Sequence, residues 1–145
     1  MPKLFFCLLL IFMIINVSNS SIISNCQDLL GMSSSGTYTI SQTIDCSTNI
    51  PFNPIAVFYG KLLGNNNTIQ NVVISSSSST VGLFKCLIGA TIQDIMLLKF
   101  SLTTSTSNCI GALAAKTLNT TISNCHLKAD PSTPNQFQGN SVIGG

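Results

Sequence analysis

A pattern that recurs three times limits what this chain can fold into. Each copy opens with a glycine after an apolar or aromatic residue and reaches a Thr-Ile pair eight to ten residues later. An amide or acid then follows two positions after the isoleucine. The glycines are Gly60, Gly82 and Gly111, the pairs are Thr68-Ile69, Thr91-Ile92 and Thr121-Ile122, and the polar positions are Asn71, Asp94 and Asn124. The isoleucines lie 23 and 30 residues apart, a period typical of stacked supersecondary units.

The residues inside each copy favour strands. Short apolar runs, such as VVI at 72–74 and IMLL at 95–98, are bounded by clusters of Gly, Asn and Ser. No sustained helical stripe occurs between residues 50 and 145. One turn of such a chain cannot bury its own apolar face, but stacking would cover Ile69 with Ile92 and Ile92 with Ile122. We therefore expect an all-β fold, a parallel β-solenoid of about three turns over residues 57–145.

Stacking also explains the polar positions. We expect two structural ladders, one of amides and acids at a corner and one of β-branched hydroxyl residues on a strand. The first contains Asn71, Asp94 and Asn124, and the second contains Thr68, Thr91 and Thr121. In the last copy, Cys125 takes the position of Ile95 and should point inward, so that His126 faces solvent.

Residues 25–98 contain "NCQDLLGM…GTYTISQTIDCS", then "FYGKLLGNNNTIQNVVI", then "VGLF" and "GATIQD". In this order of elements, the chain resembles secreted right-handed parallel β-helix proteins with GLUG-like repeats, and the resemblance extends to residue 145. Lys85 and Ala115 stand where that family often has glycine. The resemblance implies right-handed winding, a pectin-lyase-like architecture without catalysis, and a location outside the cell or on its surface.

The first 20 residues have the pattern of a secretory signal peptide. Lys3 precedes an apolar run over residues 4–17, and Ser18 and Ser20 provide small residues before a cut between Ser20 and Ser21. A membrane anchor is the alternative, although this run is shorter than the ~20 residues that cross a bilayer. We expect a secreted or cell-surface protein without a membrane span in its mature form. Secretion makes Asn66 and Asn119, each two positions before a threonine, candidates for N-glycosylation.

Residues 21–56 form an N-terminal cap in this interpretation. Asn25 could N-cap a helix through Met32, followed by a strand at 37–40. The mature chain keeps five cysteines, which tend to pair in an oxidising compartment. We expect a bridge between Cys26 and Cys46, a second bridge between Cys86 and Cys109, and a free Cys125.

The last residues, SVIGG at 141–145, look like the start of a fourth turn. A solenoid without a cap at this end would expose a strand edge, which favours association. The expectation is therefore a truncated copy, a fragment of a longer solenoid, or a protein whose open end meets a partner, including a second copy of itself.

Charge and motifs restrict the chemistry. A net charge of +2 without a lysine cluster disfavours nucleic acid, and the cysteine spacings fit no zinc site. Polysaccharide lyases and hydrolases of β-helical fold need grouped carboxylates. Asp28, Asp45, Asp94 and Asp130 are the only acids, and a pair forms only if Asp45 or Asp130 folds across Asp94. We expect no catalytic residues, metal or cofactor.

Three functions remain. The expected one is a non-catalytic module for structural display or adhesion. A module that binds glycan or protein is the alternative, with outward rows of Ser, Thr and Asn and with Tyr38, Tyr59 and Phe137 as candidates for stacking on sugars. The second alternative is a fragment of a β-helical polysaccharide lyase or hydrolase.

Overall fold

The computed structural model describes residues 20–105, 109–138 and 143–144 of the chain. Among these residues the fold is all-β apart from one short helix. The elements are β1 (Ser20–Ile23), α2 (Cys26–Leu30), β2 (Thr37–Ile40), β3 (Ile44–Asp45), β4 (Ile55–Phe58), β5 (Lys61–Ser76), β6 (Thr80–Val81), β7 (Phe84–Ile88), β8 (Thr91–Thr104), β9 (Cys109–Gly111), β10 (Ala114–Leu118), β11 (Thr121–Ser123), β12 (His126–Lys128), β13 (Gln136–Gln138) and β14 (Ile143–Gly144).

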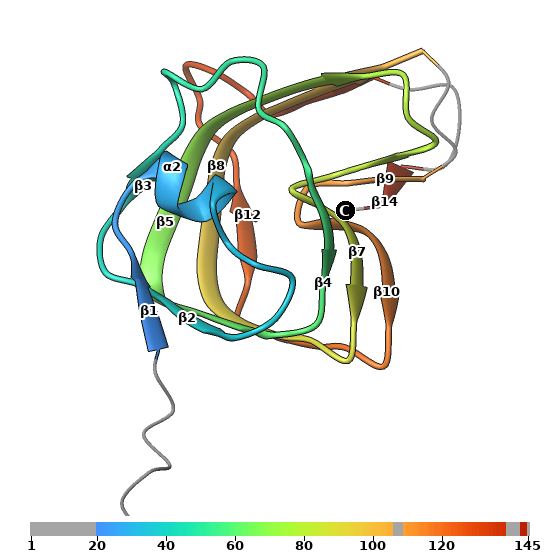
Figure 1. Ribbon diagram of the computed structural model, residues 1–145. Coiled ribbons are helices and arrows are strands. Elements are labelled where there is room, and N and C mark those ends of the chain that lie inside the picture. Colours follow the sequence, from blue (N-terminus) through green and yellow to red (C-terminus); the bar gives the residue numbers. More distant parts are fainter. Residues whose placement is uncertain (1–19, 106–108, 139–142, 145) are drawn as a thin grey trace, which may run out of the picture.

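These strands form three sheets, and every strand pair among the described residues is parallel. The largest sheet has the order β1-β2-β5-β8-β11, with β3 beside β5 and with β12 and β13 beside β8. The other two have the orders β4-β7-β10 and β6-β9-β14. Figure 1 shows β4, β7 and β10 side by side on one wall, and β5 and β8 on the wall across the interior.

The chain thus passes each wall repeatedly, and we call the successive passes layers. The first layer is residues 55–76, the second is 80–104 and the third is 109–138. Leu62 of the first layer pairs with Ile92 of the second, and Ile92 pairs with Ile122 of the third. In the sheet β6-β9-β14, Ile143 and Gly144 pair with Ile110 and Gly111, so these residues begin a further pass, as the sequence SVIGG predicts.

One predicted register is wrong. Ile69 does not pair with Ile92 but lies between Ile44 and Leu97. The cause is an irregularity in β5, where Leu63 pairs with Gln93 and Asn67 with Ile95, so that residues 64–66 lie opposite Asp94 alone. Asn65 and Asn66 make this possible because both have positive φ, a conformation that asparagine tolerates better than most residues.

Apolar side chains from all layers fill one continuous interior. Ile40, Ile44, Leu62, Ile69 and Ile92 have no exposed surface. Aromatic rings run through the first part of this core, because Tyr38 packs on Phe58 with ring centroids 6.1 Å apart, and Phe58 packs on Phe84 at 5.5 Å. The core and the parallel pairing together account for the strand spacing seen in the sequence.

The segment before the first layer covers one end of the interior. As predicted, Asn25 N-caps the helix, and its side-chain Oδ1 accepts a hydrogen bond from the Asp28 amide at 2.9 Å. The helix ends at Leu30, before the predicted Met32, because the Gly31 amide already donates to the Gln27 carbonyl as a C-cap. The predicted disulfide between Cys26 and Cys46 is confirmed, and it joins the helix to the residue after β3.

Candidate functional site

The strongest candidate site lies at the other end of the interior, where the third layer has small side chains. Phe84 in β7 pairs with Ala114 in β10, and Leu87 pairs with Thr117. In the large sheet, Cys125 takes the place of Ile95, because its neighbour His126 pairs with Met96. Each of these changes removes side-chain volume from the interior, so the third layer does not fill the space that the second layer fills.

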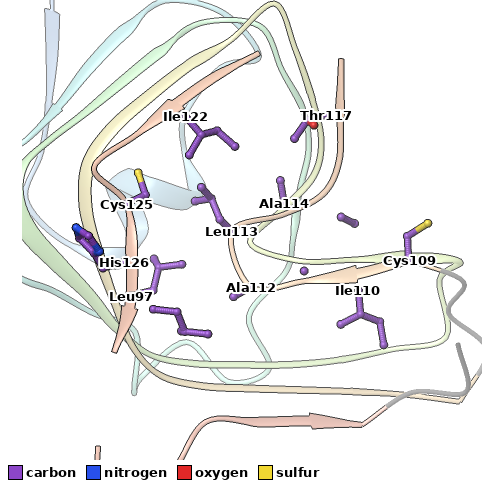
Figure 2. A pocket seen from close by; sticks show the side chains of 13 residues that line it. Leu97, Cys109, Ile110, Ala112, Leu113, Ala114, Thr117, Ile122, Cys125 and His126 are labelled. Atoms are coloured by element: carbon purple, nitrogen blue, oxygen red, sulfur yellow. The ribbon is translucent and has the colours of Figure 1, made fainter. Parts of the chain in front are cut away.

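The result is a largely apolar cavity of about 410 Å³ that is open to solvent. Its lining comes from β8, β9, β10, β11 and β12 and the residues between them (Figure 2). Leu97, Leu113 and Ile122 project into the same space, while Cys109 lies at its far rim. Cavities of this size with an apolar lining are typical of sites that take an apolar group from a partner.

Exposure changes sharply between the second layer and the third. Ile92 and Leu97 are 0% and 3% exposed, whereas their partners Ile122 and Leu127 are 43% and 39% exposed. Among the described residues, no strand pairs with the outer edges of β10, β11, β12 or β13. The third layer therefore presents both apolar side chains and unpaired backbone groups, the combination that favours strand addition.

The expected corner ladder of Asn71, Asp94 and Asn124 is divided between two corners. Asn124 donates from Nδ2 to Asp94 Oδ1 at 2.7 Å, as expected for neighbours in adjacent layers. Asn71 instead donates to both carboxylate oxygens of Asp45 at 3.0 Å. The register of β5 explains this correction, because the irregularity at residues 64–66 moves Asn71 away from the Asp94 corner.

The threonines are divided in the same way. Thr91 pairs with Thr121, as the expected ladder requires, but its partner in the first layer is Lys61. Thr68 pairs with Met96, five residues further along β8. A Thr-Ile pair resembles several points along these long strands, so the motif alone does not select the register.

The structure does not bring the carboxylates together. Asp45 bonds to Asn71, Asp94 to Asn124, and Asp130 forms a salt bridge of 3.2 Å with Lys99. Hydrogen bonds from Asn71 and from Ser47 lower the pKa of Asp45, and hydrogen bonds from Ser132 lower that of Asp130. Within the described part of the chain, no three His, Cys, Asp or Glu residues are grouped as a metal site. These acids thus act as hydrogen-bond acceptors that hold turns and corners.

The second predicted disulfide is wrong. Cys86 and Cys109 are both free, and so is Cys125. Cys86 pairs with Val57 and Lys116 in one sheet, whereas Cys109 pairs with Thr80 in another, so the two lie on different walls. Cys125 packs against the core, and burial raises the pKa of its thiol. His126 is exposed, and its Nε2 lies 3.1 Å from Asn124 Oδ1.

The remaining candidates lie apart from the cavity. Asn66 and Asn119 are exposed, both with positive φ. Tyr59 is 51% exposed, but Tyr38 is a core residue and Phe137 is partly buried against the core. The predicted signal peptide lies almost wholly outside the described residues, which begin at Ser20.

Comparison of the chain with protein-family models, with curated proteins and with solved structures found no match. In the described part of the chain, no helix has the length and the apolar content that a bilayer crossing requires. The functional argument therefore depends on the chain's own geometry. Its clearest feature is the contrast between a filled, capped end and a hollow, open end. Sequence reasoning expected an open end but missed the hollow, which the alignment of "GLFKC" with "ALAAK" could have indicated.

Proposed function

We infer that this chain is a right-handed parallel β-helix that acts outside the cell as a non-catalytic module for structural display or adhesion. The observation that carries this inference is the repeated parallel pairing of three layers around one apolar interior. Right-handed winding is the rule for connections between parallel strands of one sheet. The disulfide between Cys26 and Cys46 is compatible with an oxidising compartment.

The distribution of polar groups supports display over catalysis. The side chains of Asp45, Asp94 and Asp130 bind neighbouring residues at corners and turns, where they stabilise the backbone. The connections between layers, such as the serine-rich residues 75–80, lie between strands and can vary in length without altering the core. A scaffold of this kind can present its connecting segments to other molecules at a cell surface.

The test is to express the full chain with a C-terminal epitope tag in cells with a secretory pathway. The expected result is a tagged protein in the medium or on intact, unpermeabilised cells, with Ser21 as its first residue by N-terminal sequencing. Beads coated with this protein should adhere to cell surfaces more than beads coated with the reduced, unfolded protein. Retention of an uncut protein inside the cell would contradict the secreted location, and equal adherence of both bead types would contradict adhesion.

A further inference from the structure

We propose that the hollow end of the third layer binds an extended polypeptide strand of a partner, which adds in parallel and inserts a phenylalanine-like side chain above Ala114, beside an acidic residue opposite Lys116. This inference rests on the layered architecture of the proposed function, but not on secretion or adhesion. We call the surface formed by β10, β11, β12 and the cavity between them the docking end.

The first argument is the shape of the cavity. The interior position that Phe84 fills in the second layer is occupied by Ala114 in the third, and the position of Leu87 is occupied by Thr117. Phe84 is fully buried and packs on Phe58, so the aromatic column of the core ends at Ala114. A ring from a partner strand would continue this column and fill part of the 410 Å³ cavity.

The second argument is the free backbone edge. β10 pairs with β7 in parallel register, and within the described residues its other edge has no partner. A strand that adds to this edge satisfies the same hydrogen-bonding groups that β10 satisfies on β7. It would also cover Ile122 and Leu127, whose counterparts in the second layer are almost fully buried.

The third argument is charge. The edge strands β10, β11, β12 and β13 contain Lys116, His126 and Lys128 but no acid. Lys99–Asp130 is the only salt bridge in the described structure, so neither Lys116 nor Lys128 has a carboxylate partner there. Lys116 and Lys128 are exposed and lie outside the cavity lining, where an acid on the next strand would form a cross-strand pair.

The same features disfavour a second copy that docks end to end. Two docking ends would place one hollow against another, so that neither cavity would be filled. They would also bring together the lysines of both copies without an acid between them, which destabilises the contact. A partner strand with a bulky apolar residue and an acid satisfies shape and charge together.

The chain itself supplies a probe. A fluorescent peptide with the sequence of residues 82–90, changed by Lys85→Thr and Cys86→Asp, keeps the Phe84 ring and places a carboxylate opposite Lys116 in the register of β7 with β10. We expect saturable binding to the secreted full-length protein by fluorescence anisotropy. A peptide with the additional change Phe84→Ala should bind at least about tenfold more weakly, because burial of one aromatic ring exceeds that factor.

A variant of the protein tests the same position from the other side. Ala114→Phe fills the cavity from within and should weaken peptide binding by about tenfold or more. Ala56→Phe is the matched control, because Ala56 is exposed on β4, at the opposite edge of the same sheet. This control should bind the peptide like the unaltered protein, and circular dichroism shows whether each variant keeps its strands.

A second readout uses the thiol that lines the cavity. In a Cys86→Ser, Cys109→Ser background, the peptide should slow alkylation of Cys125, which lies in the cavity wall. Three results would overturn the proposal: equal affinity of the peptides with and without the Phe84→Ala change, unaltered binding by Ala114→Phe, or a concentration-dependent dimer that the peptide does not dissociate. Failure of secretion or adhesion leaves these binding results unchanged, so the two proposals fail separately.

Discussion

At the scale of single residues, close approach between layers determines which positions must be glycine. A methyl group added to Gly64 would overlap the main-chain oxygen of Asp94 and the side chain of Ile95 in the next layer. Gly89 differs, because nothing lies within 4 Å of an added methyl group there and only its φ of +59° opposes a side chain. These two glycines therefore separate steric overlap from backbone strain.

We expect Gly64→Ala to lower the free energy of unfolding by about 3 kcal/mol or more, since backbone atoms of two layers must move apart. Gly89→Ala is the matched control and should cost only about 1 kcal/mol, the strain of an L-residue in the left-handed region. Urea titration followed by circular dichroism measures both. Equal losses for the two variants would show that the layers do not approach each other closely at Gly64.

The carboxylate of Asp45 predicts a pH dependence. Its hydrogen bonds with Asn71 and Ser47 lower its pKa in the folded state, so its contribution to stability is present above the unfolded pKa of about 3.9. That contribution is lost as the pH falls below this value, toward the folded pKa. Because Asp45 is exposed, we expect Asp45→Asn to cost only about 0.5–1 kcal/mol at pH 7.

The measurement is the free energy of unfolding of the two proteins between pH 7 and pH 2, by urea titration. The difference between them should shrink as the pH falls below about 4. Asn71→Gly removes the donor without straining the positive φ of residue 71, and it completes a double-mutant cycle with Asp45→Asn. A difference that stays constant over the whole pH range would show that the Asp45 carboxylate does not stabilise the fold.

At the scale of elements, the N-terminal cap depends on its disulfide as well as on its capping residue. The bond between Cys26 and Cys46 closes a separation of 20 residues and ties α2 to the end of β3. Leu29 and Cys46 are fully buried, so the helix and the strand also share the core. The sequence predicted these features because an N-cap, a short helix and a cysteine near each element are local signals.

Replacing both Cys26 and Cys46 by alanine should lower the free energy of unfolding by about 3 kcal/mol, since the unfolded chain gains the entropy of an open loop. Cys86→Ala is the control, because Cys86 is free and should show a much smaller effect. Unfolding in urea under non-reducing conditions measures both. An unchanged stability of the double variant would mean that the cap is held by packing alone.

At the scale of the whole molecule, the two ends of the interior differ, and the exposed asparagines of the sequons lie on its outer surface. Asn66 lies in the irregular part of β5, and Asn119 lies in the turn between β10 and β11, next to the docking end. Both side chains belong to exposed residues with positive φ, in positions that an oligosaccharide can occupy without entering the core.

If the chain is secreted as proposed, we expect glycans on both asparagines. Treatment of the secreted protein with an N-glycosidase should lower its mass in two steps, visible by mass spectrometry after partial digestion. Asn66→Gln and Asn119→Gln should each remove one step, and the double variant should remove both. A secreted protein whose mass does not change on treatment would contradict this prediction.

The sequence by itself determined the all-β class, the stacking of strands at intervals close to 30 residues, the N-cap at Asn25 and the bond between Cys26 and Cys46. These follow from alternation of apolar residues and from local turn and cap signals, which act over a few residues. The register between layers was decided only in three dimensions, because three residues of β5 face Asp94 alone and shift every later pair in that strand. The hollow at Ala114 likewise exists only in the fold, since a small side chain leaves space only when its neighbours in the layers below are known.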